Sequence, residues 1–174
     1  LIAIDPPWPV EKLNREERPK QGDYLDYPTW TLQKIQDIPI RALADGVRGC
    51  HVYLWTTHRF LPEAFKMFKA WDVNYHCLLT WIKPDGMTPF SYMFNTEHVL
   101  FGYVGSFSVE RKGLKVAFEA PRGEHSEKPA IFYERAVAVS PATRAGERLE
   151  LFARKKREGW TVWGNEVPAA PEEP

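Results

Sequence analysis

Short apolar runs alternate with segments of helical spacing along nearly the whole chain, and this alternation limits the possible fold more than any other feature. Leu1–Ile4, His51–Trp55 and Val73–Ile82 are typical of buried strands. Between them, Phe60–Trp71 places its apolar residues three and four positions apart, as one face of a helix does. The pattern predicts an α/β fold whose sheet is largely parallel in its core.

The rest of the chain continues this pattern. The other expected strands are Glu97–Val104, Leu114–Phe118, Arg148–Ala153 and Thr161–Trp163, and the other expected helices are Thr31–Gln36 and Pro129–Val139. Two long segments without periodicity, Pro9–Pro28 and Lys83–Asn95, follow strand ends. Ligands bind at the carboxyl ends of strands in such sheets, so we expect both segments to border a functional site.

Length and composition indicate one folded domain. The chain has 174 residues, of which 44% are hydrophobic, and we expect a domain over residues 1–167 and a disordered, acidic, proline-rich tail over 168–174. No apolar run approaches the roughly 20 residues of a membrane span, and no export leader is recognisable. The two cysteines leave a disulfide open but favour buried thiols in a reducing compartment, so we expect a cytoplasmic protein. The five histidines show no metal-ligand spacing, and we expect no metal.

The formal charge of the chain is balanced, with 23 basic and 23 acidic residues. A protein that coats nucleic acid nonspecifically is usually basic overall, so this class is not favoured. Basic residues still gather locally, in clusters that, taken alone, are more typical of a solvated surface. These clusters are Arg15, Arg18 and Lys20, then Arg111, Lys112 and Lys115, and then Arg154 to Arg157.

The first apolar run ends in Asp5, Pro6, Pro7 and Trp8. The prolines hold a rigid turn whose carbonyl oxygens, together with the Asp5 carboxylate, are hydrogen-bond acceptors. Beside a stacking ring such as Trp8, these acceptors suit a planar ligand with an amino group. Accepting both hydrogens of that amine would free its lone pair and stabilise developing positive charge. A plain turn with a core tryptophan explains the same residues equally well.

This DPPW motif resembles the catalytic motif of S-adenosylmethionine-dependent amino-methyltransferases. Further segments resemble the adenine N6-methyltransferase family typified by the catalytic subunit of the eukaryotic messenger-RNA N6-methyladenosine writer, which has bacterial and phage relatives. In the family's order these are "YPTWTLQKIQDIPI", "HVYLWTT", "LTWIKP", "EHVLFG", "HSEKP", "LELFAR" and "WTVWGNE". The resemblance implies a Rossmann-like methyltransferase fold and methyl transfer to N6 of adenine in nucleic acid, with S-adenosylmethionine as cofactor.

The resemblance also implies roles for individual residues. The implied catalytic residues are Asp5, Pro6, Pro7 and Trp8; the implied cofactor-binding residues are Asp5, Lys128, Arg154, Asn165 and Glu166; the implied substrate-binding residues are Trp8, Tyr27, Glu97 and Lys128. The family often has histidine at Lys156 and glutamine at Glu166, and its segment upstream of the first strand is missing, so we expect a trimmed start.

Two of these positions can also be argued from the residues themselves. Lys128 stands at an expected helix start, where a cation without an anionic ligand is unfavourable, and this favours a carboxylate ligand. Glu150 stands near strand ends where a ribose could be bridged, although a charge on an exposed strand face is the alternative.

Several functions remain open at this stage. The intact motif favours an active enzyme over a catalytically inactive nucleic-acid-binding subunit. The small size and the lack of accessory domains favour a bacterial or phage enzyme that acts on DNA, with RNA adenosine N6 or cytosine N4 as alternative targets. Pairing with a second copy or with a related subunit is left open.

Overall fold

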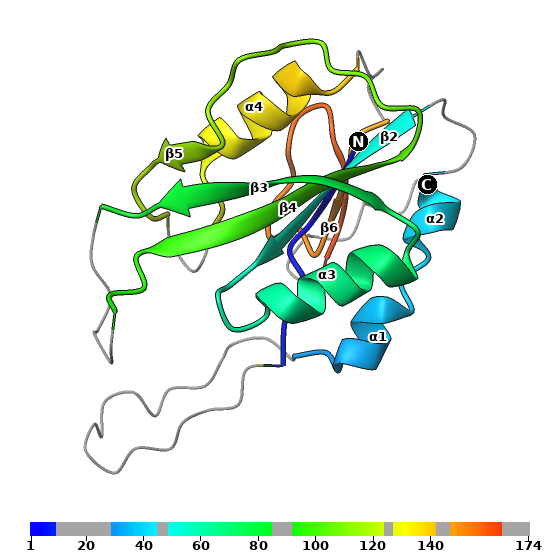
Figure 1. Ribbon diagram of the computed structural model, residues 1–174, viewed down its shortest axis with the longest axis horizontal. Coiled ribbons are helices and arrows are strands. Elements are labelled where there is room, and N and C mark those ends of the chain that lie inside the picture. Colours follow the sequence, from blue (N-terminus) through cyan, green and yellow to red (C-terminus); the bar gives the residue numbers. More distant parts are fainter. Residues whose placement is uncertain (10–28, 45–48, 85–91, 124–126, 142–146, 165–174) are drawn as a thin grey trace, which may run out of the picture.

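The computed structural model describes residues 1–9, 29–44, 49–84, 92–123, 127–141 and 147–164. These residues form a 7-stranded sheet with helices on both faces (Figure 1), and the strand order across it is β5-β3-β4-β2-β1-β6-β7. The strands are β1 (Ile2–Ile4), β2 (Gly49–Thr56), β3 (Asn74–Ile82), β4 (Thr96–Gly105), β5 (Ala117–Glu119), β6 (Leu149–Leu151) and β7 (Thr161–Trp163). The helices are α1 (Leu32–Gln36), α2 (Ile40–Leu43), α3 (Leu61–Ala70) and α4 (Ala130–Val139).

One strand runs against all the others described in this sheet. β4 is antiparallel to both of its neighbours, β2 and β3, whereas β1, β2, β6 and β7 pair in parallel and β5 is parallel to β3. The expected Rossmann-like, largely parallel sheet is therefore confirmed. The carboxyl ends of the parallel strands and the beginning of β4 meet at one edge, which is where ligands bind in such sheets.

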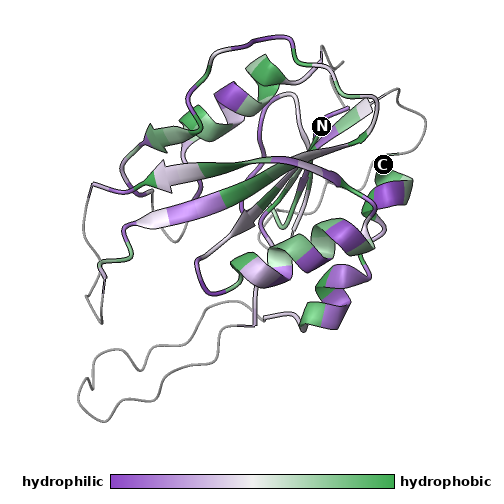
Figure 2. Ribbon diagram, in the orientation of Figure 1, coloured by the Kyte–Doolittle hydropathy of each residue, from purple (hydrophilic) through white to green (hydrophobic). Residues whose placement is uncertain are grey.

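Side chains of the central strands point alternately into two separate hydrophobic cores, one on each face of the sheet. On one face, Ile2 and Ile4 pack with residues of β2, β4, α1, α2 and α3. On the other face, Ala3 packs with Tyr53, Trp55 and the buried side of α4. This division follows from the two-residue period of a strand. Figure 2 shows both hydrophobic and hydrophilic residues on α3 and α4, as expected for helices that each cover one face of a sheet.

Most predicted elements lie within a few residues of those observed. Thr31 caps α1 by accepting a hydrogen bond from the backbone N–H of Lys34 at 3.2 Å, and Pro129 is the N-cap of α4. The strand expected over Leu114–Phe118 begins later, at Ala117. The four-residue helix α2 was not predicted, because it is too short to show a period.

Some expectations fall on residues that the structure does not describe, namely most of Pro9–Pro28, part of Lys83–Asn95 and the tail 168–174. Cys50 and Cys77 are both unpaired. Among the described helices, none combines the length and the hydropathy that crossing a bilayer requires.

Candidate active site

Asp5 is the first residue after β1 and lies at the carboxyl edge of the sheet. Its backbone N–H donates to the carbonyl oxygen of Leu151, at the end of β6, over 3.3 Å. The following turn is held by two more hydrogen bonds: Trp8 N–H donates to the Pro6 carbonyl at 2.8 Å, and Trp30 N–H donates to the Pro7 carbonyl at 2.9 Å. Each proline carbonyl keeps a second lone pair. The turn is thus fixed between β6 and the segment that leads to α1.

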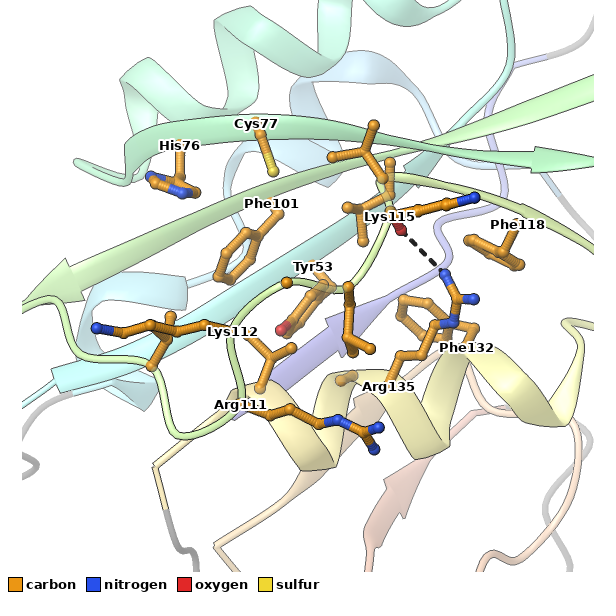
Figure 3. Close-up of a pocket in the computed structure, with 17 residues that line it drawn as sticks. Tyr53, His76, Cys77, Phe101, Arg111, Lys112, Lys115, Phe118, Phe132 and Arg135 are labelled. Atoms are coloured by element: carbon orange, nitrogen blue, oxygen red, sulfur yellow. Dashed lines mark hydrogen bonds between the residues drawn. The ribbon is translucent and has the colours of Figure 1, made fainter.

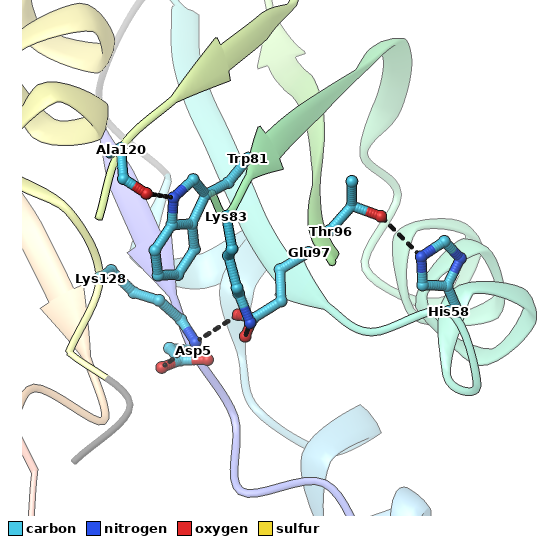
Figure 4. A network of polar contacts seen from close by, with 8 residues as sticks. All are labelled: Asp5, His58, Trp81, Lys83, Thr96, Glu97, Ala120 and Lys128. Atoms are coloured by element: carbon cyan, nitrogen blue, oxygen red, sulfur yellow. Dashed lines mark hydrogen bonds and ion pairs between the residues drawn. The ribbon is translucent and has the colours of Figure 1, made fainter. Parts of the chain in front are cut away.

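Four charged side chains of alternating sign meet at this edge (Figure 4). The Lys128 ammonium lies 3.2 Å from Asp5 Oδ2 and 3.0 Å from Glu97 Oε2. The other oxygen of Glu97 accepts a hydrogen bond from Lys83 Nζ. Lys83 follows β3, Glu97 belongs to β4 and Lys128 precedes the N-cap of α4. With Asp5 after β1, residues at four elements form one charge-balanced cluster.

The cluster is enclosed, and Asp5 is its most accessible member. Both lysine side chains are 10% exposed and that of Glu97 is 18% exposed, whereas that of Asp5 is 28% exposed. Each lysine lies over a tryptophan ring. Lys128 Nζ is 5.0 Å from the centre of the Trp55 ring, and Lys83 Nζ is 4.9 Å from the centre of the Trp81 ring. The low exposure of these charges strengthens their mutual attraction.

Burial and neighbouring charges shift the pKa values in different directions. Burial raises the pKa of Asp5 above its ordinary value of 3.8, although Lys128 opposes this shift. The pKa of Glu97 is lowered, because the two lysines together outweigh burial. Burial alone would lower the pKa of Lys128, but Asp5 and Glu97 raise it. Asp5 is therefore the carboxylate whose negative charge is least well satisfied, and the one best able to accept a further hydrogen bond.

Trp8 lies in the core and is only 6% exposed. Its indole N–H donates to the carbonyl oxygen of Trp55 at 3.0 Å, and its ring stacks on Phe60 with 5.3 Å between centroids. This is the arrangement of a core tryptophan, the alternative that the sequence left open. Little ring surface is available for a ligand in this conformation. The Trp8 ring therefore stabilises the turn by packing in the hydrophobic core.

Glu150 is also buried, at 8% exposure, so the alternative of a charge on an exposed strand face is wrong. Its two oxygens accept hydrogen bonds from the Tyr133 hydroxyl at 2.6 Å and from Arg157 Nε at 3.2 Å. Burial and the Glu150 charge raise the pKa of Tyr133. The Tyr133 contact joins β6 to α4, and the Arg157 contact joins β6 to the segment that leads to β7. Within the described residues, no hydrogen bond or ion pair links Glu150 to Asp5, Glu97 or Lys128.

The remaining expected site residues are only partly described. Arg154 follows β6. Its positive charge opposes the rise in the pKa of Asp5 that burial causes, so Arg154 lies within electrostatic reach of the cluster. Tyr27, Asn165 and Glu166 lie outside the described residues. Gly164 directly precedes the last two, and a Cβ there would lie 2.1 Å from the Ala153 carbonyl oxygen, so the end of β7 packs tightly on the segment after β6.

Comparison with known proteins identifies the family. Residues 1–166 match the MT-A70 family. The chain belongs to the MT-A70 family. Over 97% of its length it is 27% identical to the type II methyltransferase M.MunI of Mycoplasma sp, of which it covers 77%. Over 96% of its length it is 29% identical to the human N(6)-adenine-specific methyltransferase METTL4, of which it covers 37%. It also shares 28% identity with the N6-methyladenosine RNA methyltransferase MTA1 of Cryphonectria parasitica, of which it covers 51%.

Sequence reasoning missed one member of this MT-A70 site, Lys83. The residue is the last but one of the "LTWIKP" segment and follows directly on an expected strand, at the edge where ligands bind. Its backbone N–H donates to the Asn95 carbonyl at 2.8 Å, which closes the β3–β4 hairpin beside Glu97. The strand end was the available signal, but the pairing with Glu97 depends on a hairpin register that the sequence does not specify.

Proposed function

We propose that this MT-A70 domain transfers a methyl group from S-adenosylmethionine to N6 of adenine in nucleic acid, and that the nucleic acid is DNA. The observation that carries the proposal is the accessible Asp5 carboxylate, held on a rigid turn at the carboxyl edge of the sheet by a lysine that it shares with Glu97.

The chemistry of the side chains at this edge fits the cofactor. S-adenosylmethionine, when bound, supplies a methyl group on a positively charged sulfonium and carries a carboxylate and a ribose. Lys128 is the enclosed cation that would bind the carboxylate, and Asp5 is the accessible anion that would face the sulfonium. Arg154, Asn165 and Glu166 would contact the ribose and the adenine. Glu150 stabilises this region through Tyr133 and Arg157.

Asp5 carries the chemistry on the amine. Its carboxylate accepts one hydrogen of adenine N6, and the free lone pair of the Pro6 carbonyl accepts the other. These two acceptors orient the nitrogen lone pair and stabilise the positive charge that develops on the nitrogen. The methylated cation is a much stronger acid than the neutral amine, so its proton leaves to water without a strong base. Tyr27 and Glu97 would hold the target nucleoside, which must leave its stack to reach the edge.

The names of METTL4 and MTA1 support adenine as the target, and of the three names compared above only that of MTA1 specifies a polymer. M.MunI is the relative that the chain covers most fully among those compared above, and neither its name nor that of METTL4 mentions RNA, whereas the fungal MTA1 is named for RNA. An inactive binding subunit is the second candidate, but the intact Asp5 cluster speaks for activity.

The test is methyl transfer by the full-length protein to DNA and RNA of matched sequence, followed by digestion and counting of N6-methyladenine and N4-methylcytosine. N6-methyladenine in the DNA, with at least about 10²-fold slower transfer by Asp5→Asn, is the expected result. Asp72→Asn is the matched control, because Asp72 is 85% exposed and lies beyond α3. Product in RNA alone would overturn the choice of DNA, and an Asp5→Asn protein with parental activity would overturn the site.

A further inference from the structure

A cavity of about 290 Å³ lies on the α4 face of the sheet (Figure 3), and Asp5 is not among the residues that line it. Its apolar walls come from β3, β4, β5 and α4, and segment 109–116 borders it. These walls include Leu79, Phe101, Phe118, Phe132, Ala136 and Val139. β3 reaches this cavity at Cys77 and the candidate active site just after its end, at Lys83. Leu79, the lining residue of β3 nearest to Lys83, lies four residues before it, which is about 13 Å along the strand.

Among the described residues that line this cavity, all the charged ones are cations. They are Arg111, Lys112, Lys115 and Arg135. Arg135 donates to the Lys115 carbonyl at 3.0 Å and lies over the Phe118 ring, so it fastens the bordering segment to α4. Arg111, Lys112 and Lys115 are exposed, and in the described parts of the chain no ion pair joins them to a carboxylate.

The other titratable groups in the cavity add no negative charge. Burial raises the pKa of both the Tyr53 hydroxyl and the Cys77 thiol, so both are neutral near pH 7. The His76 ring packs against Phe107, with 4.5 Å between centroids. The cavity therefore combines an apolar interior with a cationic mouth.

We propose that this cavity binds a small amphipathic anion, with a hydrocarbon or aryl body between the sheet and α4 and a carboxylate or phosphate head at Arg111, Lys112 and Lys115. A nucleobase suits the interior less well, because much of its polar edge would face apolar side chains such as Leu79, Phe101 and Phe118. This proposal does not depend on the proposed methyl transfer. It assigns a binding role to the cluster of Arg111, Lys112 and Lys115, which by sequence alone is typical of a solvated surface.

Cys77 offers a direct readout, because it lines the cavity and the other cysteine, Cys50, is only 3% exposed. Alkylation of Cys77 by N-ethylmaleimide at fixed pH is followed by mass spectrometry of the full-length protein. We expect decanoate or decyl phosphate to slow it at concentrations about ten-fold below those of uncharged decanol. The comparison of the two anions distinguishes a carboxylate from a phosphate as the preferred head.

The triple variant Arg111→Ala, Lys112→Ala and Lys115→Ala should remove the preference for the anion, so that decanoate protects about ten-fold less well. The matched control replaces Arg41, Lys66 and Lys69, on α2 and α3 at the opposite face, and should behave as the parent. Equal protection by decanoate and decanol in the parent, no protection by either anion, or better protection by adenosine monophosphate would each overturn the proposal.

Discussion

Burial and one ammonium group, that of Lys128, act in opposite directions on the protonation of Asp5, the carboxylate on which the proposed chemistry depends. Burial raises the pKa of Asp5, and Lys128 is the largest influence in the opposite direction. Asp5 must be ionised to accept the amine hydrogen, so activity is present above its pKa and is lost as pH falls through it.

Lys128→Met should therefore raise the pKa of Asp5 further and move the acid limb of the activity profile to higher pH. The pH profile of kcat/KM for the cofactor checks this shift, because it reports the free enzyme, in which Lys128 pairs with Asp5. Lys155→Met is the control, because Lys155 is 58% exposed and pairs with Glu127 instead. An acid limb that stays at the parental pH would contradict the assigned role of Lys128.

Ionised Glu97 stabilises the folded protein, because its pKa is lower there than its ordinary value. Its stabilising effect is present above its ordinary value of 4.5 and is lost as pH falls through the lowered folded value. Glu97→Gln leaves Lys83 without its carboxylate, so we expect a loss of about 3 kcal/mol in the free energy of unfolding at neutral pH. Urea unfolding at pH 7 and at acid pH should show the difference shrinking in acid, and a constant difference would contradict this origin.

The position of Trp8 predicts a structural cost for its removal. Trp8→Ala deletes a ring that is 6% exposed and stacked on Phe60, and should cost about 3–5 kcal/mol in the free energy of unfolding. Trp163→Ala removes the same side chain at 49% exposure and should cost much less. Thermal unfolding of both variants checks this, and equal costs would place the Trp8 ring outside the core.

At the scale of elements, the sequence predicted what periodicity and capping residues encode. Thr31, Pro129 and the apolar spacing of Phe60–Trp71 mark their helices correctly, because these signals act within one or two turns. The direction of β4 could not be predicted, since a buried strand looks alike in either direction. α2 has only four residues, little more than one helical turn, so it shows no repeat of apolar positions.

The packing of β7 on the segment after β6 predicts a test of the segment that follows. In Gly164→Ala, the new Cβ would lie 2.1 Å from the Ala153 carbonyl oxygen, so the backbone of residue 164 must shift. The clash is with backbone atoms, so we expect a lower unfolding temperature. Because Asn165 comes next in the chain, we also expect weaker cofactor binding by calorimetry at a temperature where the variant is folded. Val162→Ala, elsewhere in β7, should bind as the parent does, and unaltered binding by Gly164→Ala would separate Asn165 from the cofactor.

For the molecule as a whole, charge balance means that binding to nucleic acid must depend on local clusters. Arg15, Arg18 and Lys20 belong to the segment that is expected from the sequence to border the site. Their replacement by alanine should weaken binding to all sequences and reduce the salt slope by about 0.9 for each phosphate that is no longer neutralised. Fluorescence anisotropy at several salt concentrations, with the Arg41, Lys66 and Lys69 variant as control, measures both effects, and an unchanged slope would assign the cluster to a solvated surface.

The candidate site shows where prediction from sequence stopped. The resemblance selected Asp5, Glu97 and Lys128, and the structure brings these three together. It did not show that Lys83 completes the cluster or that Glu150 is committed to Tyr133 and Arg157. Both facts depend on which strands are neighbours and on how α4 lies across them, and neither is encoded within a short stretch of residues.

The sharing of Lys128 has a thermodynamic consequence. Its ammonium has three hydrogens, and Asp5 and Glu97 already draw on it. In the proposed reaction, the carboxylate of the cofactor competes for the Lys128 ammonium and draws it away from Asp5. The Asp5 oxygens then become stronger hydrogen-bond acceptors. Binding of the cofactor and of the target amine are thereby coupled, and such coupling is reciprocal. The cofactor and the flipped base should each raise the affinity for the other, and Asp5 is the residue through which that cooperativity passes.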